Sequence, residues 1–383
     1  MSSPSPDNIQ IAILDDYTSP PLPNPLSDKH FSTLLSAYNN DQLSSPSTTP
    51  SPSPWKHQLQ GYTHHPQTLN TRTPDGLNAA ISRLHPYQII ATMRERTPLP
   101  ADLIKALPNL KLLLTTGMRN AAIDLGAAAE CGVIVCGTRP AQTSGARTKF
   151  DSTNEQTWAL ILGVCKGLAA DDARVKSGRD DGWQGGVNIG LAGKTLGVLG
   201  LGRLGVQCAI TGKLGFGMDV LAWSENLTQE RADEVAVERG LERGAFRVAR
   251  DKESFLREAD VVSVHYVLGE RSRGIIGARE LGWMKRDAVL VNTSRGPLVD
   301  EGALVEALRG GGIRGVGLDV FDVEPLPGDS VWRDRDWGRK VVLSPHMGYV
   351  EEETLENWYR QQAENVERYL KGEELTNVMT EQK

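Results

Sequence analysis

The sequence of 383 residues predicts an α/β protein with two domains, each a parallel sheet covered by helices. Three observations predict this fold class. Short apolar runs alternate with stretches of helical period, as in the βα units of a doubly wound sheet. The alternation occurs in two series, separated by an irregular stretch and a long helix pattern, and the chain has room for two separate cores. The second series opens with a glycine-rich turn, GLGRLG at 200–205.

The first series begins with the strand pattern IQIAIL at 9–14. Residues 42–56, QLSSPSTTPSPSPWK, are rich in Ser, Thr and Pro and lack the apolar side chains that a packed element needs, so they predict a mobile surface insertion. Regular elements follow, with strand patterns at 87–93 and 110–117 and a helix pattern between them at 99–108.

The second series follows a helix pattern at 155–175, EQTWALILGVCKGLAADDARV. After the strand that precedes GLGRLG come five more strand candidates, at 219–223, 260–266, 287–294, 315–321 and 340–346. An amphipathic helix pattern at 352–370 ends the series, and we expect it to return to the first domain. The predicted division is 1–155 for a substrate domain, 156–346 for an inserted dinucleotide domain and 347–383 for the returning helix, which makes the substrate domain discontinuous.

Composition favours a small-molecule partner. The 42 basic and 48 acidic residues are well mixed and give a net charge of -6, so no basic field for nucleic acid or an anionic membrane is expected. No apolar run approaches the ~20 residues of a membrane span, and the N-terminus lacks the pattern of a secretory signal, which together predict a cytoplasmic protein. The four cysteines lack metal-ligand spacing, and we predict reduced core cysteines and no metal: Cys131, Cys136, Cys165 and Cys208.

The turn GLGRLG predicts a dinucleotide site, because it lies between a strand and a helix. Gly200 permits the tight turn, Gly202 lets the backbone approach a pyrophosphate, and Gly205 lets helix and strand pack closely. The helix N-terminus offers N–H groups and a favourable dipole to the phosphates.

Three side chains follow predicted strands of the second series and predict acid–base chemistry. Arg295 offers a planar guanidinium suited to a carboxylate. A carboxylate such as Glu324 beside an imidazole such as His346 stabilises the protonated imidazole, which can then give a proton to a developing alkoxide. That is the acid needed when a hydride reduces a ketone.

The ordered motifs GLGRLG, NTSRGPLVDEGAL, DVFDVEPLP and SPHMGY resemble those of the NAD(P)-dependent D-2-hydroxyacid dehydrogenases, and the resemblance covers most of the chain. It implies two Rossmann-like domains and a homodimer through the dinucleotide domains. It also implies that Arg295 grips the substrate, that His346 donates or accepts the proton, and that Glu324 orients His346. Formate dehydrogenases of this fold have glutamine beside the histidine, so Glu324 argues against formate.

The resemblance also implies binding residues. In the MRERTP and TTGMRN stretches, backbone N–H groups after a strand would bind the substrate carboxylate. The implied substrate residues are Met93, Arg94, Gly117, Met118 and Arg119. The implied cofactor residues are Thr157, Gly200, Gly202, Arg203, Leu204, Gly205, Ser224, Glu225, Asn226, Tyr266, Val267, Thr293, Asp319 and Gly348. Val267 departs from the family, which usually has proline there.

Ser224 bears on the choice of cofactor. It lies 24 residues after Gly200, where an acid usually binds the adenine ribose hydroxyls and would repel a 2′-phosphate. Ser224 and Asn226 are neutral donors that could bind a 2′-phosphate, and Arg203 could reach the same region. These residues favour NADP(H) over NAD(H), with Glu225 as a rival carboxylate that would restore NAD(H).

The predicted function is reduction of small 2-oxo acids to D-2-hydroxy acids by hydride transfer from NAD(P)H. Two alternatives remain open from sequence. One is a dinucleotide-sensing corepressor without significant turnover, because such proteins share the fold and the Arg, Glu and His. The other is a phosphoglycerate dehydrogenase, against which stands the lack of chain for a regulatory domain after the last helix.

Overall fold

The computed structural model divides the chain into two compact units, residues 1–144 with 351–383 (unit 1) and residues 145–350 (unit 2). It describes residues 8–15, 25–43, 56–65, 68–140, 151–178 and 183–380. The breaks fall before the first helix of unit 2 and just after Val350, rather than at the predicted 155 and 346. The first break lies earlier than predicted because this helix starts earlier and packs on the sheet of unit 2.

Unit 1 is built on a parallel sheet of five strands in the order β2-β1-β3-β4-β5. The strands are β1 (Asn8–Leu14), β2 (Gln58–His65), β3 (Ile89–Thr92), β4 (Leu112–Thr115) and β5 (Ile134–Cys136). The core strands β3 and β4 are buried at every position, which explains their continuous apolar sequences. The sequence QLQGYTHH of β2 lacks such a signal, because β2 is an edge strand with mostly accessible side chains.

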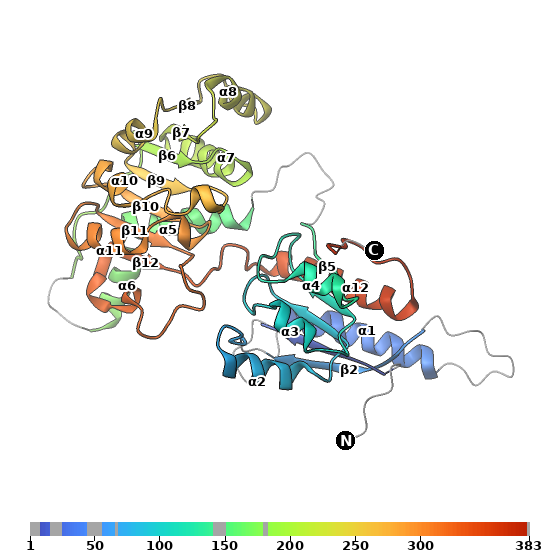
Figure 1. The fold of residues 1–383 in the computed structure, drawn as a ribbon. Coiled ribbons are helices and arrows are strands. Elements are labelled where there is room, and N and C mark those ends of the chain that lie inside the picture. Colours follow the sequence, from blue (N-terminus) through green and yellow to red (C-terminus); the bar gives the residue numbers. More distant parts are fainter. Residues whose placement is uncertain are drawn as a thin grey trace. The chain divides into compact units, whose positions relative to one another are not determined.

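The helices of unit 1 are α1 (Pro25–Leu43), α2 (Pro74–Leu84), α3 (Ala101–Lys105), α4 (Leu125–Glu130) and α12 (Glu352–Lys371). Figure 1 shows α12, near the C-terminal end of the chain, packed beside α1 from the N-terminal end. Residues 351–383, which contain α12, are thus part of unit 1. The predicted insertion begins too early, because Gln42 still belongs to α1. Residues 44–55 of that insertion lie outside the described residues.

Unit 2 is built on a parallel sheet of seven strands in the order β12-β11-β10-β9-β6-β7-β8. The strands are β6 (Thr195–Leu199), β7 (Asp219–Trp223), β8 (Phe246–Val248), β9 (Val261–Val264), β10 (Val289–Asn292), β11 (Gly315–Leu318) and β12 (Val341–Leu343). The first strand of the unit, β6, lies between β7 and β9, so the strand order reverses there. Ligands bind at such a switch point, outside the carboxyl ends of the strands.

The α-helices of unit 2 are α5 (Ser152–Lys166), α6 (Leu168–Lys176), α7 (Arg203–Ile210), α8 (Gln229–Glu238), α9 (Lys252–Glu258), α10 (Ala278–Trp283) and α11 (Glu301–Arg309). Short turns of other helix types are η1 (Thr211–Gly215), η2 (Glu270–Ser272), η3 (Gly296–Leu298), η4 (Val331–Arg333) and η5 (Arg335–Lys340). The single helix predicted at 155–175 is wrong. The structure has two helices there. The first, α5, begins at Ser152 with Asp151 as its N-cap, and Gly167, with a φ of 62°, ends it before α6 begins.

The cysteines are free, and Cys136, Cys165 and Cys208 lie in the core as predicted. Cys131 is an exception, because it caps the C-terminus of α4 and is exposed. In the part of the chain that the structure describes, no helix is long and apolar enough to cross a membrane, and no three His, Cys, Asp or Glu side chains are grouped to hold a metal ion.

Candidate functional site

Most of the predicted residues of unit 2 follow strands of one parallel sheet, so they gather at its carboxyl edge. In spatial order from one side of the sheet to the other these residues are His346 after β12, Glu324 after β11, Arg295 after β10, Tyr266 after β9, Gly200 after β6 and Ser224 after β7. The strand order thus places these residues at one edge of the sheet, as the sequence predicted.

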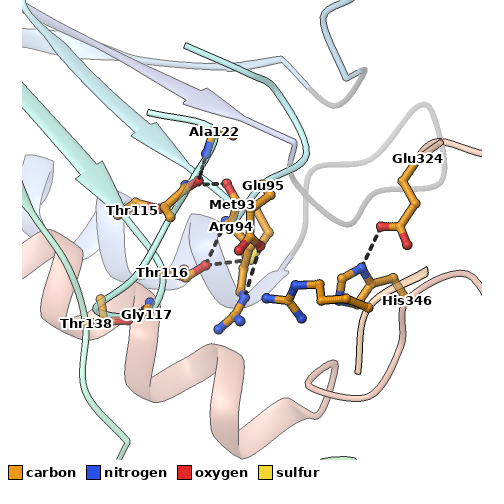
Figure 2. Close-up of polar contacts among 12 residues, drawn as sticks. Met93, Arg94, Glu95, Thr115, Thr116, Gly117, Ala122, Thr138, Glu324 and His346 are labelled. Atoms are coloured by element: carbon orange, nitrogen blue, oxygen red, sulfur yellow. Dashed lines mark hydrogen bonds and ion pairs between the residues drawn. The ribbon is translucent and has the colours of Figure 1, made fainter. Parts of the chain in front are cut away.

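Glu324 and His346 are in direct contact. The Nδ1 atom of His346 lies 2.6 Å from Oε2 of Glu324 (Figure 2). Oε1 of Glu324 accepts the N–H of Phe321 at 2.8 Å. Burial would raise the pKa of Glu324, but the hydrogen bond and charge of His346 outweigh it and lower the pKa below its usual value. Glu324 is therefore an ionised partner of Nδ1, and this contact leaves the other ring nitrogen, Nε2, on the side of the ring away from Glu324.

Asp319 holds the backbone that carries His346. One carboxylate oxygen of Asp319 accepts the hydroxyl of Ser344 and the N–H of Met347 at 2.8 Å, and the other accepts the N–H of Gly348 at 2.9 Å. His346 donates its own N–H to the backbone carbonyl of Asp319 at 2.7 Å and has a φ of 57°. A non-glycine residue adopts that conformation only where its surroundings enforce it. Burial raises the pKa of Asp319.

Arg295 extends from a fixed turn after β10. Its backbone carbonyl accepts the side-chain amide of Asn292 at 2.9 Å, and its Nη1 donates to the carbonyl of Ser294 at 2.8 Å. The charge of Arg295 is one of the causes of the lowered pKa of Glu324, so the guanidinium lies within electrostatic range of that carboxylate. Cation, carboxylate and imidazole thus form one group.

The three glycines of the GLGRLG turn differ in what requires them. A side chain at Gly200 (φ 99°) would place its Cβ 2.7 Å from the carbonyl oxygen of His265, and one at Gly205 would place its Cβ 2.0 Å from the carbonyl oxygen of Gly200. Both glycines are therefore needed by the fold. A Cβ at Gly202, the N-cap of α7, would meet no protein atom within 4 Å. The open space there, beside the N–H groups of the first turn of α7, suits a dinucleotide phosphate.

The turn after β7 carries the predicted ribose-binding residues. Ser224 accepts the N–H of Leu227 at 3.1 Å through its carbonyl, and the N–H of Glu225 donates to the hydroxyl of Tyr266 at 3.3 Å. Glu225 and Asn226 are exposed, and so is Val267 after β9.

Arg203 lies at the start of α7 with Leu204, but its guanidinium pairs with Asp151, the N-cap of α5. Burial would raise the pKa of Asp151, and the hydrogen bond and charge of Arg203 lower it below its usual value. Arg203 thus has a partner within the protein, and its role in cofactor choice stays a prediction.

Thr157 and Thr293 form a buried pair between α5 and the end of β10. Their hydroxyl oxygens are 2.8 Å apart, and Thr157 lies 2.7 Å from the carbonyl of Thr153. Gly348 packs so closely that a Cβ would lie 3.0 Å from Asp319 and 3.3 Å from Thr153. These predicted cofactor residues are therefore brought to the same edge of the sheet as the glycine-rich turn.

The predicted substrate residues of unit 1 follow β3 and β4, which are neighbours in the sheet. Arg94 donates its N–H to Oγ1 of Thr116 at 3.0 Å, and a Cβ at Gly117 would lie 2.9 Å from Nη1 of Arg94 (Figure 2). The guanidinium carbon of Arg94 also lies 5.8 Å from the ring centre of Trp358 on α12. Arg94 is therefore placed beside the turn after β4.

Two of these predictions need correction. Met93 is buried, with its sulfur 3.2 Å from the hydroxyl of Thr116, so it packs against the turn after β4 instead of lining a pocket. The N–H of Gly117 donates to Oγ1 of Thr138 at 2.8 Å, so it is already satisfied within the protein. The N–H groups of Met118 and Arg119 have no acceptor among the described residues. The sequence gave no signal of the contact between Gly117 and Thr138, because Thr138 follows β5 and lies 21 residues further along the chain.

Comparison with known proteins matches these features to one family. Residues 158–348 match the family model for D-isomer specific 2-hydroxyacid dehydrogenase, NAD binding domain. A glyoxylate reductase of Thermococcus litoralis is 34% identical over 284 residues, which cover 73% of this chain and 79% of the relative. A D-3-phosphoglycerate dehydrogenase of Methanocaldococcus jannaschii is 33% identical over 292 residues, which cover 76% of this chain and 51% of the relative.

The chain belongs to the D-isomer specific 2-hydroxyacid dehydrogenase family. Among solved structures, that of phosphoglycerate oxidoreductase from Vibrio cholerae has a TM-score of 0.71 and 30% identity and covers 94% of this chain and 98% of its own. The D-lactate dehydrogenase of Escherichia coli shares the fold with a TM-score of 0.71 at 20% identity, covering 97% and 100%. The predicted family, fold class and enzyme class are confirmed, with unit 2 as the NAD(P)-binding domain.

Proposed function

We propose that this dehydrogenase reduces small 2-oxo acids to D-2-hydroxy acids with NAD(P)H. The observation that carries the proposal is the Glu324–His346 contact of 2.6 Å within range of the Arg295 charge, at the edge that holds the glycine-rich turn. The glyoxylate reductases among the relatives act on a substrate of this class by name. A bound nicotinamide would supply the hydride.

The roles follow from the geometry of each side chain. His346, held at Nδ1 by Glu324, donates a proton from Nε2 to the substrate oxygen as the carbonyl becomes an alcohol. Arg295 binds the substrate and stabilises the negative charge that grows on the same oxygen. Glu324 keeps the imidazole in one orientation through its contact with Nδ1. Asp319 fixes the backbone on which His346 is mounted.

Unit 1 binds the substrate carboxylate in this proposal. The N–H groups of Met118 and Arg119 and the guanidinium of Arg94 provide donors after neighbouring strands, whereas the N–H of Gly117 serves Thr138. Backbone N–H groups in a turn after a strand are suited to an anion.

NADP(H) is the favoured cofactor in this proposal. Ser224 and Asn226 replace the acid that would repel a 2′-phosphate. A comparison of the Michaelis constants for NADH and NADPH decides the preference. A lower constant for NADH would show that Glu225 takes the place of the missing acid.

The protein forms a homodimer through unit 2 in this proposal. Four large apolar side chains are exposed on α6 and just after it: Leu168, Val175, Trp183 and Val187. Arg339 joins the two segments, because it pairs with Asp171 on α6 at 3.1 Å and donates to the carbonyl of Gly186 at 3.4 Å. An exposed apolar surface of this kind is typical of an interface between subunits.

The function is tested by assaying purified protein with glyoxylate, hydroxypyruvate and branched 2-oxo acids against both cofactors. We expect turnover with at least one of them, and a loss of about 100-fold or more in kcat for His346→Ala with cofactor affinity unchanged. Absence of turnover with intact cofactor binding would favour a dinucleotide sensor instead.

Phosphoglycerate dehydrogenation is the second candidate, because several relatives carry that name. The aligned region spans about half the length of those relatives. Oxidation of 3-phosphoglycerate with a kcat/KM above that for reduction of the simple 2-oxo acids would select this candidate.

A further inference from the structure

Asp15 is a buried acid at the switch point of the sheet in unit 1, and the chemistry above does not use it. It follows β1, is fully buried and has a φ of 57°. The strand order β2-β1-β3 reverses at β1, and the carboxyl ends of β1 and β3 form the crevice where such sheets bind ligands.

The Asp15 carboxylate bonds to residues at both ends of the turn that follows β3, and it also has a side-chain hydrogen bond with Thr68. Oδ1 accepts the hydroxyl of Thr97 at 2.7 Å, and Oδ2 accepts the N–H of Thr97 at 3.0 Å and the hydroxyl of Thr92 at 3.3 Å. Arg96 donates from Nη1 to the backbone carbonyl of Asp15 at 3.2 Å. Asp15 therefore ties together both ends of the turn formed by residues 93–96.

This turn carries Arg94 in an unusual conformation. Arg94 has a φ of 45°, a left-handed conformation that is strained for a residue with a side chain. Its N–H donates to Thr116 at 3.0 Å and its carbonyl accepts the amide of Asn120 at 2.5 Å. The turn is thus anchored by Asp15 on one side and by the β4 turn on the other, so the guanidinium of Arg94 stays beside Gly117.

We propose that Asp15 is a positioning residue for substrate binding, which acts through Thr92 and Thr97 to hold Arg94 in its binding conformation. We rest this on the proposed function, in which Arg94 and the β4 turn bind the substrate carboxylate. Asp15 itself does not touch the substrate.

A carboxylate suits this role better than an amide. It accepts from one backbone N–H and from the hydroxyls of Thr92 and Thr97, and Thr68 is a further side-chain partner. Both oxygens of a carboxylate accept such bonds, whereas an amide would offer one oxygen and one NH₂ group. Burial raises the pKa of Asp15, although Thr97 and the charge of Arg96 oppose the rise. An acid retained in a buried site despite its desolvation is typical of functional sites.

The test uses Thr97 as a matched pair. Thr97→Val keeps the shape but loses the hydroxyl that donates to Asp15, whereas Thr97→Ser keeps that hydroxyl. We expect Thr97→Val and Asp15→Asn to raise KM for the 2-oxo acid about tenfold or more, because small misplacements of binding groups are costly. Thr97→Ser is expected to stay within about twofold of the wild type, since it keeps the bonds that align the turn.

Dissociation constants for NADPH and NADH, from quenching of protein fluorescence, separate positioning from general damage. We expect them unchanged in all variants, because the cofactor binds to unit 2. Asp28→Asn is the control. It makes the same chemical change in unit 1, where Asp28 accepts the hydroxyl of Tyr62 at 2.7 Å, and it should leave the substrate KM unaltered.

The outcomes distinguish the two levels of proposal. Lowered thermal stability with a normal substrate KM in Thr97→Val would show that Asp15 is structural only and would overturn the inference. If Arg94→Ala raises KM but Thr97→Val and Asp15→Asn do not, only the inference fails. If Arg94→Ala also leaves KM unchanged, the proposed binding role of unit 1 fails, and the positioning role falls with it.

Discussion

At the scale of single residues, the motifs indicated which side chains matter but not how they are held. Arg295, Glu324 and His346 were evident from their motifs, and the geometry brings the acid and the imidazole to 2.6 Å. The role of Asp319 in fixing the His346 backbone was not evident, because its partners at Ser344, Met347 and Gly348 are distant in the chain. No local pattern reports such a contact.

Replacing Glu324 with glutamine should separate orientation from structure. An amide can either donate to or accept from Nδ1, so it no longer fixes the orientation and tautomer of the ring as a carboxylate does. We expect kcat to fall by about 100-fold, the low end of what acid–base catalysis contributes. Steady-state kinetics with a 2-oxo acid measure this. Glu301→Gln, which alters an acid bonded to Trp332 in the same unit, should retain its kcat. Equal losses in both variants would contradict the role of Glu324.

Glu324 also predicts a dependence of stability on pH. Its pKa in the folded protein is lower than the usual value that it takes in the unfolded chain. It therefore stabilises the fold at pH above the usual carboxyl pKa, and this contribution is lost as the pH falls through the lowered pKa. In this acid range we expect the melting temperature to fall less steeply with decreasing pH for Glu324→Gln than for the wild type. Parallel declines would contradict the lowered pKa.

The glycines of the GLGRLG turn predict opposite effects of one substitution. Gly202→Ala should leave thermal stability unchanged, because its Cβ enters open space, but it should raise the cofactor KM about tenfold, or ~1.4 kcal/mol of binding. Gly205→Ala should destabilise the fold, because its Cβ would lie 2.0 Å from a carbonyl oxygen. Unchanged cofactor binding in Gly202→Ala would exclude a phosphate at that position.

At the scale of secondary structure elements, periodicity located the buried strands and missed two features. The edge strand β2 has the polar sequence QLQGYTHH, so its pairing with β1 depends on the sheet beside it. The break between α5 and α6 was missed because both sides have helical period. Gly167 provides the break, since it adopts φ 62° and allows Arg339 to approach.

Two glycines with the same backbone conformation test this explanation of the break. Gly167→Ala and Gly178→Ala both place a side chain at positive φ, which costs about 1 kcal/mol each. Only the Cβ at Gly167 would meet the guanidinium of Arg339, at 2.2 Å from Nε, whereas the Cβ at Gly178 would meet nothing within 4 Å. We expect Gly167→Ala to be the more destabilising in denaturant titrations. Equal losses would show that Arg339 moves aside freely.

At the scale of the whole molecule, the two sheets have separate hydrophobic cores in the two units. The chain forms unit 1 from both of its ends, because α12 packs against α1. Amphipathic periodicity predicted that this last helix needs a packing partner, and we expected it to return to the first domain. The exposed apolar surface around α6 is a property of the assembled unit, because its residues come from segments joined by Arg339.

The proposed dimer predicts the effect of polar substitutions on that surface. Trp183→Ser with Val187→Ser removes two side chains that are 78% and 86% exposed, so the fold should persist while the dimer dissociates. Sedimentation velocity over a range of concentrations measures the change in mass. Leu214→Ser, at an exposed leucine on η1, is the control and should stay dimeric. A wild-type protein of monomer mass would contradict the proposal.

The sequence by itself determined the fold class, the order of buried strands and the glycine-rich turn, and it predicted Arg295, Glu324 and His346 as site residues. These depend on short-range patterns, namely strand and helix period and residue types at fixed spacing. Only the tertiary structure showed three contacts. Gly117 donates its N–H to Thr138, Arg203 pairs with Asp151, and Asp15 accepts the N–H of Thr97 at the end of the turn that carries Arg94. Each of these contacts joins residues more than twenty positions apart, so it depends on how the strands and helices pack.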